Sequence, residues 1–439
     1  MASTYIYRDI GTPTNAYKGT VSHWIKKSII GASETEYGTF AAWLNGGNTT
    51  RTHLNFYNNT IYFYSQQHSM VLQTNRVFRD TNAWYHIVVA WDTTQSTASN
   101  RVKIYVNGVQ ETSFSTANYP AQNAVLECNT SGRRFGVGTL ANGSGVAYGF
   151  WDGSISHFHF IDGTQYAASD FGSTDSTTGE WKINTSPSVT YGNNGFFWLK
   201  DNIATTDNSP NSNTFTVGGG TLTKTEDCPS NVFATMNPLI PGQTNYTYSN
   251  GNNTITQGSA AWVKSNSTLG MSSGKYYWEA KYVSGSYTVV GVDKTDTATP
   301  YPSTSSSAVG WKRNGNVEVA TTPQTDIASY AHGDIVSVAL DMDNGCVYFG
   351  KAGVWQNSGD PTSGSSKTGA YSLPSYVANT PYFATVSPYG SGATSMNFGN
   401  GYFGTTAVSS AGTNASGIGI FEYDVPTGYT ALSTKGLNL

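Results

Sequence analysis

The sequence is poor in charged residues, and this shortage limits the partners it can have. Lys and Arg number 23 and Asp and Glu number 27 among 439 residues, so charged residues make up only 11% of the chain. About a quarter is usual in globular proteins. With a net charge of −4 and no local cluster of Lys and Arg, the chain lacks the basic surface that nucleic-acid binding requires. We therefore expect no nucleic-acid partner.

Cysteine is equally scarce. Cys128, Cys228 and Cys346 are odd in number and far apart, which excludes a readable disulfide framework and a CxxC zinc site. Because Cys346 lies within a strand-like pattern, we expect it to be a buried free thiol.

Targeting and membrane signals are missing as well. The N-terminal residues lack the basic and apolar regions of a signal peptide. The long uncharged stretch at residues 403–421 is polar and rich in glycine, unlike a membrane span. We expect synthesis in a cytoplasm and no membrane insertion.

Aromatic residues, in contrast, are abundant at 13%, and Gly, Ser, Thr and Asn dominate the remainder. Disordered chains have few aromatic residues and a strong charge imbalance, so this composition indicates folded cores with surfaces made soluble by hydroxyl and amide groups. A chain of 439 residues exceeds what one core usually serves, which predicts two domains.

Two hairpin patterns organise the chain. Residues 84–111 contain an apolar run, a polar turn, strict alternation of apolar and polar residues, and then Asn107-Gly108, a dipeptide typical of turns with positive φ. Residues 334–355 repeat the pattern around an Asp-Asn-Gly turn. Each hairpin predicts a β-rich unit built as a sandwich.

Further strands complete an all-β prediction of two antiparallel β-sandwich (jelly-roll) domains. The first strand is expected at 17–26, a bulged or doubly buried strand at 155–160, and a short helix at 167–171. Proline, glycine and asparagine mark an irregular connector that still carries apolar residues. The predicted divisions are a first domain at 1–203, a connector at 204–243, a second domain at 244–402 and a C-terminal tail at 403–439.

Particular motifs carry a resemblance to two families. Residues 84–108, Trp151-Asp152-Gly153 and residues 160–163 resemble the laminin-G/concanavalin-like jelly roll. Residues 274–279, Val309-Gly310-Trp311 and residues 333–349 resemble a SPRY domain. The combination, with its connector, is similar to proteins of tailed bacteriophages, notably marine ones.

The resemblance implies a non-enzymatic virion surface protein of the fibre or knob type, made in the host cytoplasm and displayed on the exterior of the particle. Its partners would be a host-surface glycan or envelope protein and other capsid or tail proteins. A capsid decoration without a dedicated receptor stays open, as do a polysaccharide depolymerase and a cellular lectin or adhesin. The sequence also leaves open whether the chain forms a homo-oligomer.

Enzyme motifs are missing from the sequence. Glycosidases with a concanavalin-like fold need two carboxylates about the scissile bond, and their Glu-x-Asp-x-x-Glu strand signature is absent. Asp341 and Asp343 lead into Asn344-Gly345, so we interpret them as turn residues. We expect no enzymatic activity.

The same resemblance implies a metal site. The jelly-roll family often carries a rim Ca²⁺, for which Asp152, Asp162 and Asp170 offer oxygen ligands, although Asp-Gly is also ordinary turn chemistry. His157 and His159 lack a nearby third metal ligand, so a sheet face with paired imidazoles is the simpler interpretation.

Tyrosines in the loops of the second domain are candidate ligand contacts. SPRY domains bind partners through loops at one end of the sandwich, which indicates Tyr301, Tyr371 and Tyr389. An exposed tyrosine offers apolar area and a hydroxyl at low entropic cost. The alternative is that each tyrosine packs its own loop onto the sheet. Trp278 and Trp311 are expected in the core.

Overall fold

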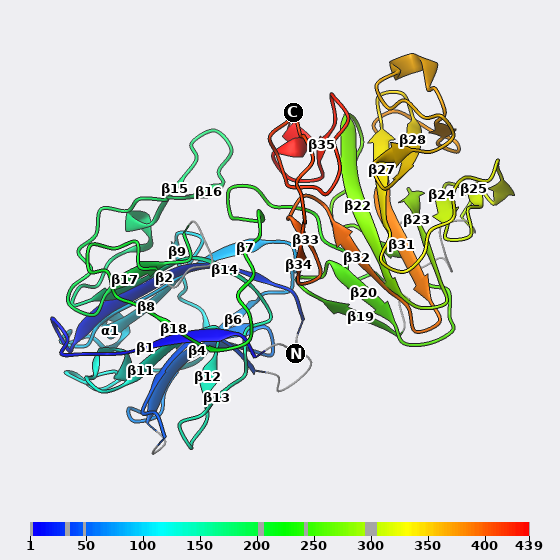
Figure 1. The fold of residues 1–439 in the computed structure, drawn as a ribbon. Helices are drawn as coiled ribbons and strands as arrows, with labels where there is room; N and C mark the ends of the chain where they lie inside the picture. The colour runs from blue at the N-terminus through cyan, green and yellow to red at the C-terminus, as the bar shows by residue number, and fades with distance from the viewer. Residues whose placement is uncertain are drawn as a thin grey trace. The chain divides into compact units, whose positions relative to one another are not determined.

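The chain folds into two compact all-β units, Met1–Lys224 and Thr225–Leu439. A computed structural model describes residues 3–30, 36–46, 50–200, 206–240, 245–294 and 305–438. Each unit is a sandwich of two mainly antiparallel sheets (Figure 1), which confirms the predicted fold class. None of the helices in these ranges is long and apolar enough to cross a membrane.

The N-terminal sandwich pairs an eight-stranded sheet with a six-stranded sheet. In order across the first sheet lie β10 (Phe114–Asn118), β6 (Met70–Val77), β5 (Thr60–Ser65), β4 (Arg51–Tyr57), β3 (Glu36–Trp43), β11 (Arg134–Val137), β1 (Tyr5–Asp9) and β18 (Thr216–Gly219). Across the second lie β17 (Phe196–Trp198), β14 (Gly153–Asp162), β2 (Lys18–Lys27), β7 (Trp84–Asp92), β8 (Val102–Val106) and β9 (Val109–Gln110). Shorter elements are α1 (Ala98–Arg101), η1 (Glu127–Asn129), β12 (Leu140–Ala141), β13 (Ala147–Tyr148), η2 (Ala168–Asp170), β15 (Gly172–Thr174) and β16 (Trp181–Ile183).

The predicted hairpin at 84–111 is present as β7, β8 and β9. Its turn residues Asn107 and Gly108 both have positive φ, 47° and 81°. Strand β7 is buried on both faces, because its odd-numbered residues from Ile87 enter the core between the sheets while Val88 and Ala90 pack on the outer side. The continuous apolar run of this strand follows from that double burial.

Strand β14 carries a bulge, one of the two arrangements that its sequence predicts. The pairing register with β2 shifts between Ser156 and His159, and His157 adopts a positive φ of 46°. The extra residue turns both Phe158 and Phe160 into the core between the sheets. The strand predicted at 17–26 as the first of the chain is the second. The strand β1 comes before it and pairs with β11 and β18.

A covering segment, residues 164–191, packs on the outer face of the six-stranded sheet. His86 of that face accepts a hydrogen bond from Trp181 Nε1 at 3.0 Å on its Nδ1, and its Nε2 lies 2.8 Å from Ser22 Oγ. Its ring stacks between Trp24 and Trp181, at centroid distances of 4.9 and 5.9 Å. Burial lowers the pKa of His86 to about 3, so a neutral imidazole holds the cover in place.

His23 is a polar group in the middle of the N-terminal core. It follows Val21 on the inward face of β2 and packs against the rings of Phe158 and Phe40, with centroids 5.0 and 6.0 Å away. Neither ring nitrogen has a hydrogen-bond partner among the described residues. Burial lowers the pKa of His23 to about 3. This imidazole is therefore buried neutral at a cost in stability.

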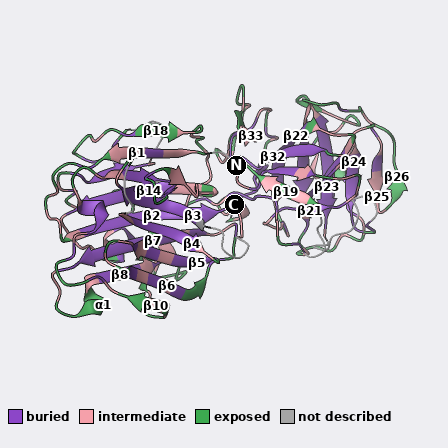
Figure 2. Ribbon diagram, turned by 90° about the horizontal axis from the view of Figure 1, so that it is seen from below, coloured by how far each residue is buried: buried purple, intermediate pink, exposed green. Residues whose placement is uncertain are grey.

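The C-terminal sandwich is built in the same way. Across one sheet lie β19 (Tyr246–Ser249), β20 (Thr254–Gln257), β32 (Ala393–Asn397), β22 (Lys275–Ser284), β27 (Ile335–Asp341), β28 (Cys346–Lys351) and β29 (Val354–Trp355), with β30 (Tyr371–Ser372) beside β28 and β35 (Thr430–Ala431) beside β22. Across the other lie β21 (Ser265–Asn266), β31 (Phe383–Tyr389), β23 (Tyr287–Asp293), β24 (Val309–Lys312), β25 (Val317–Val319) and β26 (Thr322–Pro323). Shorter elements are η4 (Gly364–Ser366), β33 (Tyr402–Phe403), β34 (Thr406–Ala407) and η5 (Gly436–Asn438). Trp278 and Trp311 are fully buried between the sheets of this unit, as predicted. Figure 2 shows exposed residues on edge strands of both units, such as β10, β18 and β26.

The stretch 403–439 is set apart in the sequence as a tail, but its described residues, 403–438, pack as part of the C-terminal unit. Phe421 and Tyr429 are buried with Tyr277 and Cys346 on the outer face of the sheet, and β35 pairs in parallel with β22 (Figure 1). The buried thiol expected at Cys346 is present. The segment is held because its few aromatic residues fill one apolar surface, a long-range arrangement that its glycine-rich composition conceals.

Glu279 binds this C-terminal segment to the sheet through hydrogen bonds. Its buried carboxylate accepts hydrogen bonds from the backbone N–H groups of Glu422 and Tyr423, both at 2.9 Å. Tyr277 Oη and Asn397 Nδ2 donate to it as well, at 2.9 and 3.3 Å. Burial raises the pKa of Glu279 to about 7, although the four donors oppose that shift.

Residues 204–243, predicted as a connector, divide between the two units. Phe215 is buried in the N-terminal core, next to β18, which pairs with β1. Phe233 and Met236 are buried in the C-terminal unit. The boundary falls between Lys224 and Thr225, because the apolar residues of this stretch belong to two different cores.

We expect His23→Leu to stabilise the N-terminal unit by about 1–3 kcal/mol at neutral pH, because it removes two buried nitrogens without hydrogen bonds. This gain in stability over the wild type increases as the pH falls. The unfolded chain protonates this imidazole below pH about 6.5 while the folded chain does not, so wild-type stability falls by about 1.4 kcal/mol per pH unit for this group. Urea unfolding at pH 7 and pH 5 measures both effects. If the free energy of unfolding fell by the same amount from pH 7 to pH 5 in the variant and in the wild type, His23 would not be a buried neutral imidazole.

Glu279→Gln is expected to release the C-terminal segment, because an amide cannot accept from all four donors. The readout is the labelling rate of the Cys346 thiol by a disulfide reagent, in a chain whose other two cysteines are alanine. We expect at least a ten-fold faster rate. Glu318→Gln, which alters a carboxylate paired with Lys312 elsewhere in the unit, is the control and leaves the rate unchanged. Equal labelling rates of Cys346 in both variants would show that Glu279 does not hold the C-terminal segment on the sheet.

Candidate functional site

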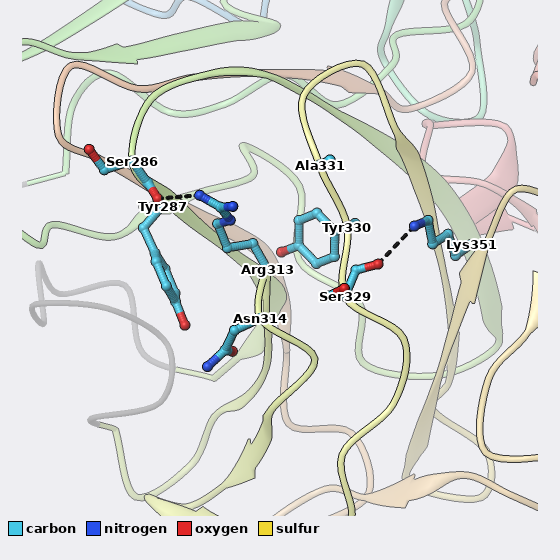
Figure 3. A pocket seen from close by; sticks show the side chains of 8 residues that line it. All are labelled: Ser286, Tyr287, Arg313, Asn314, Ser329, Tyr330, Ala331 and Lys351. Atoms are coloured by element: carbon cyan, nitrogen blue, oxygen red, sulfur yellow. Dashed lines mark hydrogen bonds between the residues drawn. The ribbon is translucent and has the colours of Figure 1, made fainter.

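The C-terminal unit has a pocket of about 440 Å³ where strands of both sheets end (Figure 3). Four short segments line it: Ser286–Tyr287 at the start of β23, Arg313–Asn314 after β24, Ser329–Ala331 before β27, and Lys351 at the end of β28. Its volume lies within the range of roughly 300–1,000 Å³ typical of small-molecule sites. Hydroxyl, amide, aromatic and cationic groups dominate the lining.

Arg313 is the central charged group of this pocket. Its Nη1 donates to the carbonyl oxygen of Ser286 at 2.6 Å, which draws the guanidinium toward the start of β23 (Figure 3). The guanidinium carbon lies 5.7 Å from the ring centre of Tyr282 and 6.0 Å from that of Tyr287. In the described ranges no carboxylate forms an ion pair with it. Arg313 is thus a positioned cation with donors available to a ligand.

Lys351, the second cation, is already neutralised. Its Nζ lies 2.9 Å from a carboxylate oxygen of Asp334 and donates to the Ser329 carbonyl at 2.7 Å. Asp334 in turn accepts from the Ala331 backbone N–H at 2.8 Å, and these contacts hold the pKa of its carboxyl below the usual value against its partial burial. The Lys351–Asp334 pair therefore fixes one wall of the pocket and leaves its positive charge on Arg313.

Tyr330 forms the floor of the pocket. It is fully buried, and its hydroxyl lies 3.0 Å from the carbonyl oxygen of Trp311 and 3.3 Å from that of Thr288. Its backbone N–H donates to the Arg313 carbonyl at 2.9 Å. Burial raises the pKa of the Tyr330 hydroxyl well above its usual value, so it stays a proton donor. One residue thereby connects the ends of β23 and β24 to the segment before β27.

A row of partly exposed aromatic rings continues from the pocket. Trp262 stacks on Tyr389 with centroids 4.5 Å apart and meets Tyr287 edge-on at 5.3 Å. Tyr287 and Tyr389 face each other across the β23–β31 ladder. We refer to Trp262, Tyr287 and Tyr389 as the aromatic row.

The three tyrosines predicted as ligand contacts have different positions. Tyr389 belongs to the aromatic row. Tyr371 is 7% exposed and packs against Phe349 in the core, so it matches the alternative interpretation of a residue that holds its own loop. Tyr301 lies outside the described residues.

The three aspartates proposed as calcium ligands do not form a shared site. Asp162 Oδ2 accepts hydrogen bonds from the backbone of Thr14 and Asn194, so this buried carboxylate ties two loops together. Asp170 Oδ2 accepts from Ala167 N at 2.9 Å and caps η2. Burial raises the pKa of the Asp152 carboxyl.

One oxygen of the Asp162 carboxylate, Oδ1, is buried without a partner among the described residues. A single such atom does not meet the demand of Ca²⁺ for six to eight oxygens. Across the described ranges no three His, Cys, Asp or Glu side chains gather as a metal site. His159 Nδ1 instead lies 2.9 Å from Tyr191 Oη, beneath the covering segment.

The sequence did not indicate Arg313, Tyr287 or Trp262 as candidate ligand contacts. Arg313-Asn314-Gly315 carries a weak signal, since a cation beside an Asn-Gly turn stands out in a chain that is 11% charged. Nothing in the local sequence indicates that Trp262 and Tyr287 meet Tyr389, because these three residues come from separate segments.

Residues 275–400 match the family model of the SPRY domain, so the C-terminal sandwich is a SPRY sandwich. Among solved structures, the chain is similar to the SPRY domain of human HERC1 at 22% identity, over 35% of this chain and 92% of that one, with a TM-score of 0.28. The PSpry domain of TRIM65 gives 13% identity, 37% and 89% coverage and a TM-score of 0.28. Stonustoxin gives 17% identity, covering 39% of this chain and 27% of its own, with a TM-score of 0.27. A comparison with curated proteins gave no match.

Tyr330→Phe is expected to destabilise the C-terminal unit by about 1 kcal/mol, because the Trp311 and Thr288 carbonyls lose a buried donor. Tyr371→Phe is the matched control, since its hydroxyl only reaches the Thr325 carbonyl at 3.5 Å, and its effect should be smaller. Denaturant unfolding followed by tryptophan fluorescence measures both. A larger loss of unfolding free energy in Tyr371→Phe than in Tyr330→Phe would show that the Tyr330 hydroxyl does not hold the pocket floor.

Proposed function

We propose that this chain is a non-enzymatic binding protein on the exterior of a virion, and that the SPRY pocket with its aromatic row contacts the host surface. The observation that carries the binding proposal is the Arg313 guanidinium, oriented in an open pocket and lacking an ion-pair partner in the described ranges. A cation held in this way without a structural counter-ion is typical of ligand recognition.

The virion location rests on the sequence. The laminin-G-like motifs at residues 84–108, combined with SPRY motifs, resemble proteins of tailed bacteriophages. The low charge content and the wealth of Ser, Thr, Asn and Gly suit a protein that functions outside the cell. In this proposal the N-terminal sandwich is a laminin-G-like unit, and other capsid or tail proteins are its partners.

Binding is favoured over hydrolysis by the lining of the pocket. Glycosidases need two carboxylates flanking the scissile bond. The eight lining residues include no Asp or Glu, and nearby Asp334 is engaged by Lys351. The proposed role is therefore capture of a surface molecule, a glycan or an envelope protein, without its cleavage.

The test begins with purified particles of the phage that encodes the chain, labelled with gold-coupled antibody against it. We expect label on the tail or its fibres, and we expect the purified chain to block adsorption of the phage to its host. Arg313→Ala should weaken this block at least ten-fold, while the control Arg76→Ala, at a surface pair with Glu111 in the N-terminal unit, should not. Particles without label, or equal blocking by both variants, would contradict the proposal.

A further inference from the structure

We infer that the SPRY pocket takes a carboxylate-bearing sugar unit, such as a uronate, with the carboxylate on Arg313 and the sugar ring against Tyr287. This inference rests on the proposed binding function and names the chemical class of its ligand. It follows from the charge, the lining and the backbone of the pocket.

The charge of the pocket fits one carboxylate. Arg313 supplies a planar set of donors whose spacing matches the two oxygens of a carboxylate. Lys351 adds no further positive charge, because Asp334 neutralises it at 2.9 Å. A single uncompensated cation suits a monoanion better than a phosphate group, which carries up to two negative charges at neutral pH.

The rest of the lining fits a sugar ring. A pyranose presents C–H groups on its faces and hydroxyls around its edge. Tyr287, which the Arg313 guanidinium approaches at 6.0 Å, offers a ring for the C–H face, and the aromatic row extends this surface toward Trp262 and Tyr389. Asn314 and Ser286, both exposed, offer an amide and a hydroxyl to the edge (Figure 3).

The backbone of the pocket argues against an extended acidic peptide. Peptide strands add to a protein by pairing with free main-chain groups. Here the N–H groups of Ser286, Arg313, Tyr330 and Ala331 already donate to Tyr389 O, Thr288 O, Arg313 O and Asp334 Oδ2, at 2.8 to 3.2 Å. These four N–H groups therefore cannot pair with an added strand, and we assign recognition of the ligand to the side chains.

The test compares two probes that differ only at C6, methyl β-glucuronide and methyl β-glucoside, by ligand-observed NMR with the full chain. We expect the glucuronide to bind at least ten-fold more tightly at low salt and this preference to shrink at high salt. Arg313→Gln should abolish the preference, Arg313→Lys should retain part of it, and Arg76→Gln, the control in the N-terminal unit, should keep all of it.

The outcomes separate this inference from the proposed function. Equal affinity for both probes, lost in a Tyr287→Ala variant, would overturn the acidic-sugar inference and leave a binding pocket in place. A glucuronide preference unchanged by Arg313→Gln would overturn the assignment to this pocket. Thermal unfolding of each variant shows that the loss of binding is not a loss of fold.

Discussion

The pocket depends on one buried hydroxyl, that of Tyr330. It joins the carbonyls of Thr288 and Trp311, which belong to neighbouring strands, while the same residue's amide binds the carbonyl of Arg313. A loop cation would otherwise sample many rotamers, at a cost in conformational entropy when a ligand orders it. Tyr330 binds the Arg313 backbone and the Ser286 carbonyl accepts from its guanidinium in the free protein. Part of the entropy cost of ordering Arg313 is therefore met before a ligand binds.

The same principle stabilises both sandwiches on their outer faces. In each unit a covering segment packs apolar side chains on the outer face of a sheet, and one buried polar side chain of that sheet also binds it there. His86 accepts from Trp181 in the N-terminal unit, and Glu279 accepts from the backbone at Glu422 and Tyr423 in the C-terminal unit. Such buried groups must keep their partners, because an unsatisfied one is costly. A chain with few charged residues can therefore hold long irregular segments firmly.

The sequence predicts local structure well and long-range packing poorly. Alternation and turn chemistry were enough to place the hairpin at 84–111. The misfit of phases in residues 155–160 indicated either a bulge or burial on both faces, and only the structure places the bulge at His157. The role of residues 403–439 was not accessible, because Phe421 and Tyr429 are too sparse to form a periodic pattern. The pocket was missed for a related reason: its lining comes from four segments that only the two-sheet fold brings together.

The most direct measurement is a crystal structure of the chain with a uronate disaccharide bound. We expect the carboxylate within hydrogen-bond distance of the Arg313 guanidinium, the sugar ring against Tyr287, and no change in the Tyr330 hydrogen bonds. A ligand bound elsewhere, with the pocket filled only by water at saturating disaccharide, would contradict this expectation.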